Sequence, residues 1–308
     1  MEDELKKCFR GSKRACWKMR QLTVLSGKGG TGKTTIVASF AALAKKCVVA
    51  DCDVDAPDLH LLLNPETLEV EDFRGSKLAS IDHVKCIKCG QCQKNCRFNA
   101  ISEDLKIDPF TCEGCGVCKI VCPKNAITLN ERTSGKIYTS KTTYGYMIHA
   151  LLYPGESNSG KLVSFVRQKA RSFAAKEDLN IVLIDGAPGI GCPVIASITG
   201  VDVGIIVTEP TVSGIHDLVR ALDLLGHFNI MPLVCINKYD LNTRKSEEII
   251  EFCSRANVEV VGKISFDTIV TEAIVNGKPV IEYAPESNVA KEIHRIWDKV
   301  YSVLMKGD

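Results

Sequence analysis

Short apolar runs alternate with longer segments of helical spacing along most of this chain, and the first run leads into a glycine-rich turn. The runs are rich in Val, Ile and Leu, which is typical of parallel strands buried on both faces. Strands that alternate with helices predict an α/β fold, with a mostly parallel sheet, helices on both faces and ligands at the carboxyl ends of the strands. The predicted strands are residues 20–25, 47–51, 180–185, 203–208, 233–237 and 258–264.

The alternation stops between about residues 80 and 132, where cysteine, glycine and lysine replace the apolar runs. This stretch is an internal repeat, because residues 86–101 and 112–127 align in one register and both end in Asn-Ala-Ile. We therefore expect a small inserted domain at 80–132, within a larger domain formed by residues 19–79 and 133–308.

The two ends of the chain have different patterns. Residues 1–18 mix six basic and three acidic residues without periodicity, which predicts a flexible extension. The last helix has an apolar stripe flanked by charges of both signs, and this mixture favours packing on the edge of the domain over a basic membrane anchor. We therefore expect no stable membrane association. The stripe consists of Val289, Ile293, Ile296, Trp297, Val300 and Leu304.

The composition of the chain and its expected cellular compartment limit which partners and which cysteine chemistry we expect. Apolar residues make up 45% and charged residues 25% of the chain, as in an ordinary globular protein, and the net charge of +2 gives no general reason to expect nucleic acid as a partner. The first twenty residues lack the apolar core of a signal peptide, so we expect a cytoplasmic protein. Because thiols stay reduced there, the 15 cysteines are better interpreted as metal or cluster ligands than as disulfides.

The glycine-rich turn contains the P-loop pattern G-x-x-x-x-G-K-[ST], between a strand and a predicted helix at residues 34–46. Its glycines allow backbone N–H groups to converge on phosphate oxygens, and the helix N-terminus adds a favourable dipole. We expect Lys33 to reach the β- and γ-phosphates and Thr34 to offer its hydroxyl to Mg²⁺. The predicted nucleotide-binding residues of this P-loop NTPase sheet are Gly27, Gly29, Gly30, Thr31, Gly32, Lys33, Thr34 and Thr35.

Eight cysteines of the insert form the pattern C-x2-C-x2-C-x3-C twice. The insert resembles two-cluster ferredoxins, in which three thiolates hold one 4Fe-4S cubane and the fourth crosses to the other. Structural zinc is the alternative, although it usually takes two separated pairs of ligands. Arg97 departs from the ferredoxin pattern, since a proline usually follows the fourth cysteine. The resemblance implies one cluster on Cys86, Cys89, Cys92 and Cys122, and a second on Cys112, Cys115, Cys118 and Cys96.

A further lysine, Lys28, lies inside the P-loop two residues before Gly30. In this the chain resembles the deviant Walker ATPases of the MinD and Mrp group, to which the nitrogenase iron protein is related. The resemblance implies a homodimer closed over two ATP molecules, in which Lys28 reaches the partner's nucleotide and stabilises charge as an arginine finger does. The alternative is that Lys28 serves only the nucleotide of its own subunit.

Three aspartates complete the predicted site. Asp53, flanked by Asp51 and Asp55, resembles the family's first switch aspartate, which positions the attacking water; a loop that merely exposes three carboxylates to solvent is the alternative. We expect Asp51 to support the Mg²⁺ shell. Asp185 ends a strand and resembles the second switch, so we expect it to hold Mg²⁺ through water. The predicted catalytic residues are Lys28, Lys33 and Asp53.

The segment from Asn237 to Asp240 matches the N-K-x-D pattern that reads guanine in GTPases. The ATPase group is instead indicated by its resemblance to Lys28 and to the segments around Asp185 and Glu209. In that group an asparagine at the position of Asn237 contacts adenine. We therefore expect ATP as the nucleotide, with GTP as the alternative.

Cys192 follows the second switch. The nitrogenase iron protein has a ligand of its intersubunit cluster at the matching position, but its other cluster cysteine has no counterpart in residues 154–161. The C-x-x-C of carrier-type relatives is absent too, with only Cys253 in that region. We therefore expect a small buried thiol at Cys192, and keep a bridging cluster as the alternative.

Three functions fit an ATPase joined to two cubanes. The resemblance favours iron–sulfur or metallocentre assembly, in which the protein delivers a cluster with a scaffold or apo-protein partner. ATP-gated electron transfer to a redox acceptor protein is the second, and a non-redox positioning ATPase with structural clusters is the third. In each, hydrolysis would change the shape of the dimer and reposition the insert.

Overall fold

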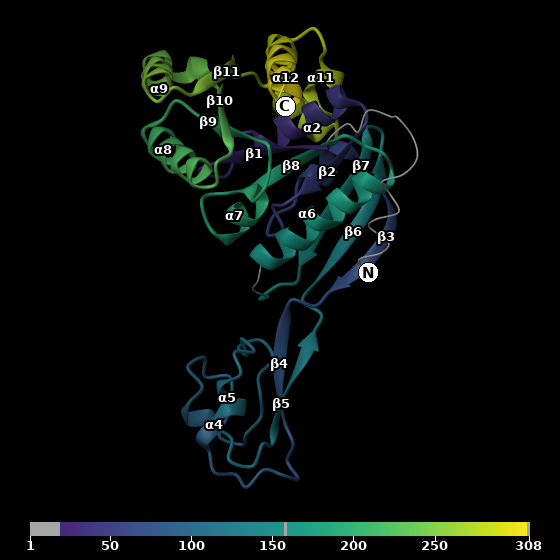
Figure 1. The fold of residues 1–308 in the computed structure, drawn as a ribbon, viewed down its shortest axis with the longest axis vertical. Coiled ribbons are helices and arrows are strands. Elements are labelled where there is room, and N and C mark those ends of the chain that lie inside the picture. Colours follow the sequence, from purple (N-terminus) through teal and green to yellow (C-terminus); the bar gives the residue numbers. More distant parts are fainter. Residues whose placement is uncertain (1–18, 157–158, 307–308) are drawn as a thin grey trace, which may run out of the picture.

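The computed structural model describes residues 19–156 and 159–306, so the predicted flexible extension at 1–18 lies outside the described residues. Figure 1 shows a large α/β domain from which a small domain projects at the end of a two-stranded ribbon. The strands are β1 (Arg20–Ser26), β2 (Cys47–Asp51), β3 (Glu66–Phe73), β4 (Ser76–Ile81), β5 (Ile127–Arg132), β6 (Gly135–Thr142), β7 (Gly145–Leu152), β8 (Ile181–Pro188), β9 (Val203–Thr208), β10 (Met231–Asn237) and β11 (Glu259–Ile264).

Helices connect most of these strands. They are α2 (Lys33–Ala44), α3 (Leu59–Leu63), α4 (Gln91–Lys94), α5 (Val117–Ile120), α6 (Ser159–Lys176), α7 (Cys192–Ile198), α8 (Val212–His227), the 3₁₀ helix η2 (Tyr239–Asn242), α9 (Thr243–Arg255), α10 (Ile269–Val275), α11 (Val280–Tyr283) and α12 (Asn288–Lys306).

The main sheet confirms the predicted α/β class. Within the described residues it has nine strands in the order β11-β10-β9-β1-β8-β2-β7-β6-β3. The pairs from β11 to β7 are parallel, whereas β6 pairs antiparallel with both β7 and β3. β2 and β9 have the predicted bounds. The antiparallel strands were not predicted, because β3 is exposed at every position except Phe73 and carries no apolar run.

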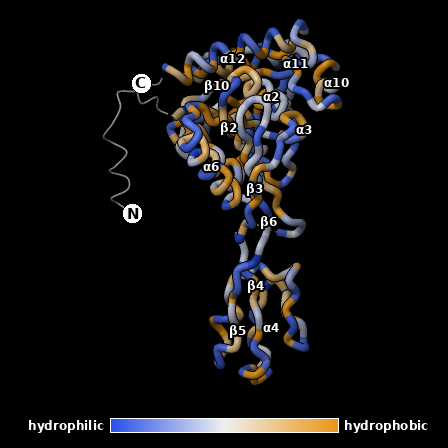
Figure 2. Tube along the Cα trace, turned by 90° about the vertical axis from the view of Figure 1, so that its right-hand side faces the viewer, coloured by the Kyte–Doolittle hydropathy of each residue, from blue (hydrophilic) through white to orange (hydrophobic). Residues whose placement is uncertain are grey.

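Two apolar cores cover the two faces of this sheet. One joins the strands to α2 and α12, where the rings of Phe40 and Trp297 lie 5.0 Å apart. The other joins them to α6, α7, α8 and α9. Figure 2 shows hydrophobic residues along the strands and helices of the large domain. Burial on both faces explains why the central strands are continuous apolar runs.

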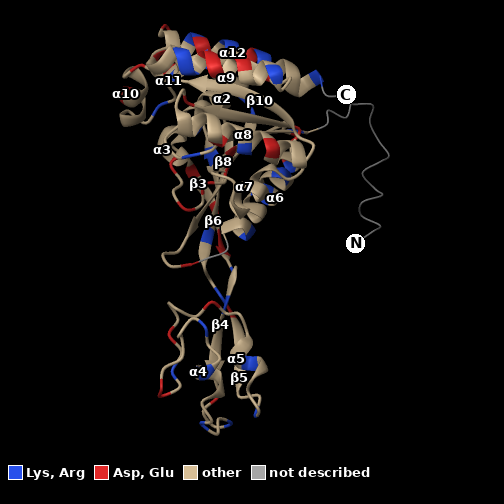
Figure 3. Ribbon diagram, turned by 90° about the vertical axis from the view of Figure 1, so that its left-hand side faces the viewer, with Lys and Arg blue, Asp and Glu red and all other residues tan. Residues whose placement is uncertain are grey.

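The final helix packs as its pattern predicts. Its outer surface carries charges of both signs in Figure 3, and the six residues of the apolar stripe are all buried. None of the helices in the described ranges combines the length and apolarity needed to cross a bilayer.

The small domain contains the cysteine repeat, and its backbone repeats as well. The helical turns α4 and α5 occupy equivalent places, 26 positions apart. Left-handed φ angles also recur in register, at Lys88 (54°) and Gly114 (61°) and at Asn99 (53°) and Asn125 (48°). β4 and β5 form the antiparallel ribbon that joins this domain to β3 and β6, so the predicted boundary at residue 80 lies inside β4.

Candidate nucleotide site and cysteine pockets

The glycine-rich loop lies between the end of β1 and the start of α2. Gly32 has a φ of 90°, and a Cβ added there would lie 2.4 Å from the amide nitrogen of Asn237, so only glycine fits without displacing that side chain. The same nitrogen donates a hydrogen bond to the carbonyl of Thr31 at 2.8 Å. Asn237 therefore supports the loop, and its contact with adenine stays a prediction.

Two predicted Mg²⁺ ligands lie side by side because β2 and β8 are neighbours, with Asp51 in register with Asp185. The hydroxyl of Thr34 donates to Oδ2 of Asp185 at 2.8 Å. Oδ2 of Asp51 and Oδ1 of Asp185 are buried without a hydrogen-bond partner. Since buried polar atoms are rarely left without partners, two such carboxylate oxygens beside a hydroxyl fit a Mg²⁺ site, and oxygen is the ligand that Mg²⁺ prefers.

The electrostatics of these carboxylates follow from burial. Burial raises the pKa of Asp185 to about 6, and Lys33 and the Thr34 hydroxyl oppose this shift. Burial, followed by the charge of Asp185, raises the pKa of Asp51 well above its usual value. Burial thus disfavours the ionised form of both carboxylates, and a nearby cation favours it. Lys33 supplies one such charge, and Mg²⁺ would supply a second.

Asp53 lies in the loop after β2 and is half buried. Its backbone N–H donates to Oδ1 of Asp51 at 3.1 Å. Burial raises its pKa, with Lys33 as the main opposing charge. The fold thus brings Lys33, Thr34 and all three predicted aspartates to the carboxyl ends of adjacent strands.

Lys28 is held within its own chain. Its Nζ lies 3.1 Å from Oε2 of Glu209, and the other oxygen of Glu209 accepts from Lys238 at 2.6 Å. Burial acts to raise the pKa of Glu209, but the hydrogen bonds from the two lysines outweigh it and lower the pKa. Lys28 must therefore leave Glu209 before it can reach a partner's nucleotide. The segment around Glu209 resembles the ATPase group and follows a strand, but the sequence did not predict this ion pair.

A pocket beside the P-loop offers room for a base. It is lined by Asn237, Lys238 and Phe266 together with Gly30 and Thr35. Oδ1 of Asp240, the aspartate of the N-K-x-D pattern, accepts from the backbone N–H of Phe266 at 2.7 Å. This carboxylate oxygen is thus engaged by its own chain, whereas guanine recognition in GTPases requires the aspartate to face the base.

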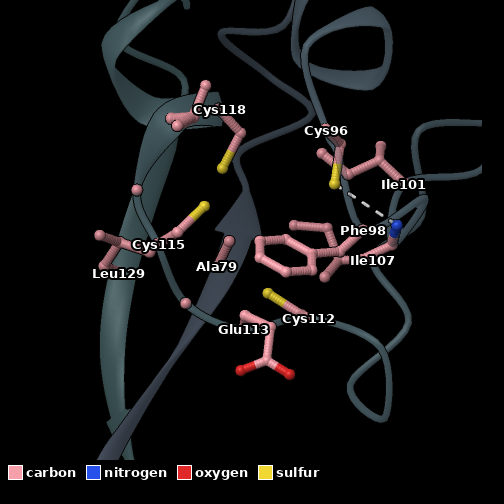
Figure 4. Close-up of a pocket in the computed structure, with 14 residues that line it drawn as sticks. Ala79, Cys96, Phe98, Ile101, Ile107, Cys112, Glu113, Cys115, Cys118 and Leu129 are labelled. Carbon is pink, nitrogen blue, oxygen red and sulfur yellow. Dashed lines mark hydrogen bonds between the residues drawn. The ribbon is translucent and has the colours of Figure 1, made fainter.

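In the described insert, each of two pockets is lined by four of the eight cysteines. In Figure 4, Cys96 faces the loop and helical turn that carry Cys112, Cys115 and Cys118. Three cysteines of each pocket come from one run and the fourth from the other, which is the crossing that ferredoxin spacing implies. The second pocket is lined by Cys86, Cys89, Cys92 and Cys122.

The crossing cysteines have equivalent hydrogen bonds. The backbone N–H of Ala100 donates to the sulfur of Cys96 at 3.4 Å, and that of Ala126 to the sulfur of Cys122 at 3.3 Å. Hydrogen bonds to cysteine sulfurs are one of the factors that set the potential of iron–sulfur clusters.

No group of three or more His, Cys, Asp or Glu side chains in residues 19–156 and 159–306 is arranged to hold a metal ion. In a cubane each cysteine binds a different iron, so the sulfurs surround a volume instead of converging on one ion. The assignment of iron–sulfur clusters therefore rests on the spacing of the cysteines in the sequence, on the exchange of one cysteine between the two runs, and on the two pockets. It does not rest on a coordination geometry that is already formed.

Cys192 is exposed, so the expectation of a small buried thiol is wrong. It is the first residue of α7, and a Cβ added to Gly160 in α6 would lie 3.1 Å from its Cβ. A free cysteine is usually buried, but at the start of this helix the side chain faces outward while Val194 and Ile198 face the core.

A P-loop between the first strand and a buried helix, with aspartates at the ends of two neighbouring parallel strands, defines a P-loop nucleotide-binding protein. Residues 22–280 match the CobQ/CobB/MinD/ParA nucleotide binding domain, and the chain belongs to this family. This assignment confirms the predicted class, an ATPase domain of the MinD/ParA type.

Similarity extends over most of the chain. An uncharacterised protein of Methanocaldococcus jannaschii is 34% identical over 91% of this chain and 96% of its own length. The septum site-determining protein MinD of Bacillus subtilis is 22% identical over 84% of this chain and 81% of its own. The structure of MinD from Pyrococcus horikoshii, complexed with Mg-ADP, has a TM-score of 0.58 at 18% identity and covers 91% of this chain and 95% of that one.

Proposed function

We propose that the chain is an ATP-operated switch in which two copies close over two ATP molecules and thereby position the cysteine-rich domain against a protein partner. The observation that carries this is the gathering of Lys33, Thr34, Asp51 and Asp185 at one edge of the sheet. Mg²⁺, held by Thr34, Asp51 and Asp185, would neutralise charge on the phosphates. Lys28, after leaving Glu209, would act across the dimer.

The domain division supports this coupling. We place the ATPase domain at residues 19–79 and 133–308 and the insert at 80–132, with the ribbon of β4 and β5 spanning the boundary between them. The strand that ends at Asp51 continues through α3 into β3 and β4, which lead into the insert. The first switch, Asp53, is thus followed in the chain by the strands that lead to the insert.

We also propose that the insert holds two 4Fe-4S clusters, one in each cysteine pocket. The crossing of Cys96 and Cys122 supports cubanes over zinc, which needs one compact set of four ligands. The burial of Cys92 fits a cluster shielded from solvent on one side.

A positioning role with structural clusters is favoured over the assembly role that the sequence suggested. The relatives include septum site-determining proteins, and a ligand set complete within the insert suits clusters that stay in place. Transfer of a cluster to an apo-protein, or ATP-gated electron transfer to an acceptor, remains the second candidate, supported by the exposure of Cys89 and Cys115 at the pocket rims.

Light scattering on the D53N variant, prepared without oxygen, tests the switch. We expect a dimer with ATP and a monomer with ADP, because the substituted amide retains the shape of the loop but cannot orient the attacking water. A T34A variant is the control and should stay monomeric with both nucleotides, since it lacks the hydroxyl predicted to bind Mg²⁺. The same mass with ATP and ADP would refute the proposal.

A further inference from the structure

One arginine of the ribbon, Arg132, contacts both domains. Arg132 ends β5 opposite Ser76 of β4. Its guanidinium lies 2.6 Å from Oε1 of Glu156 in the large domain, and also donates to the hydroxyl of Ser76 and to the carbonyl of Pro109 in the insert. Pro109 lies three residues before Cys112. One side chain thus contacts the ATPase domain, the ribbon and the cysteine-rich domain.

Glu156, the acidic partner of Arg132, uses both of its carboxylate oxygens. The second oxygen of Glu156 accepts from the Ser76 hydroxyl at 2.9 Å. The side chains of Arg132 and Glu156 are only 22% and 9% exposed. A forked, largely buried arrangement of this kind fixes geometry far better than an exposed ion pair does.

Backbone contacts stiffen the same point. Where β3 passes into β4, the N–H of Ser134 donates to the carbonyl of Phe73 at 2.8 Å. The hydroxyl of Ser134 accepts a hydrogen bond from the N–H of Gly75, and the backbone carbonyl of Ser134 accepts one from the N–H of Tyr153. Hydrogen bonds at its base therefore tie the ribbon to the chain segment that leads to Glu156.

Glu156 precedes in the chain a helix that packs against the element following the second switch. Three residues further along the chain α6 begins, and its Gly160 packs against Cys192, seven residues after Asp185. Arg167 of α6 donates to the carbonyls of Ala196 and Thr199 at 2.9 and 2.7 Å, which ties α6 to the end of α7. A movement of α7 with the second switch would therefore carry α6 with it.

We propose that Arg132 is a positioning residue, and that its contacts with Glu156 and Pro109 transmit the nucleotide state of the ATPase domain to the orientation of the cysteine-rich domain. This inference rests on the proposed ATP-driven closure. The coupling between the two domains then passes through the largely buried ion pair of Arg132 and Glu156. Either domain can influence this pair through its own contacts with it.

The distance between the domains provides the test. Fluorophores are placed through non-natural amino acids at Val84, which is 97% exposed in the insert, and at Arg244, whose side chain is 90% exposed. A trace of labelled protein is mixed with unlabelled protein, and energy transfer is recorded with ADP and with a non-hydrolysable ATP analogue. We expect a narrow distribution that shifts between the two nucleotides.

The variants R132Q and E156Q are each expected to broaden the distribution and abolish the shift, and the double variant should be no worse than either single one. ATPase activity should be unchanged. K85Q is the matched control, because it breaks an exposed ion pair with Asp82 in the same domain and should retain the shift. Wild-type behaviour in R132Q and E156Q, or no shift in the wild type, would overturn the inference. Light scattering on the same samples reports separately whether ATP-driven dimerisation, and with it the proposed function, has failed.

Discussion

The K28A variant is expected to hydrolyse ATP at least about 100-fold more slowly than the wild type, because a cation supplied across an interface contributes about 10³ to 10⁵ in rate. ATP affinity should change little, since the phosphates keep Lys33 and the loop N–H groups. Single-turnover hydrolysis and nucleotide binding by the same preparation measure the two quantities. E209Q is the matched control: it removes the carboxylate that holds Lys28 and should keep hydrolysis intact.

Mixing distinguishes action across the dimer from action within one subunit. K28A retains Asp53, and D53N retains Lys28, so a mixed dimer contains one complete composite site. We expect the mixture to recover hydrolysis that neither variant shows alone. A mixture as inactive as its components would contradict a trans role and favour the alternative, in which Lys28 serves its own nucleotide.

The C122A variant is expected to lose the cluster of the pocket formed with Cys86, Cys89 and Cys92, although Cys122 belongs to the other run. Iron should fall from about eight to about four atoms per chain, because each cubane holds four. Iron and sulfide analysis, with EPR of the reduced protein, measures this loss in material prepared without oxygen.

The crossing makes the result specific. C122A should give the EPR spectrum of C86A, and C96A that of C112A, because each pair lines one pocket. C192A is the control and should keep all its iron, since Cys192 lies outside both pockets. Zinc without sulfide in the wild type, or a match between C122A and C112A, would contradict the cluster assignment.

Periodicity predicted the centre of the fold well and its edge poorly. The runs ending at Asp51 and Thr208 are buried on both faces, so their composition alone marks them as parallel strands. β3 lies at the sheet edge, where polar residues are tolerated, and its pairing with β6 depends on contacts between segments about 70 residues apart. The hydrophobic pattern within one segment carries no information about such long-range contacts.

The same distinction applies to the site. The P-loop and the aspartates at strand ends are fixed by local chemistry, and the fold places them together. The partners of Lys28 and Arg132 are single carboxylates, Glu209 and Glu156, far away in sequence. Glu209 lies in a segment that resembles the ATPase group and Glu156 in no recognised motif, but neither pattern indicates these ion pairs, so only the three-dimensional structure identifies them. The exposure of Cys192 was missed for a related reason, because it depends on where α7 begins.

The link between nucleotide and clusters can be measured directly with Mn²⁺ in place of Mg²⁺. Pulsed EPR of the reduced protein then reports the distance between the nucleotide metal and the iron clusters. The account predicts a defined distance with ADP that changes when a non-hydrolysable ATP analogue replaces it. The same distance with both nucleotides, or no cluster signal in protein prepared without oxygen, would contradict it.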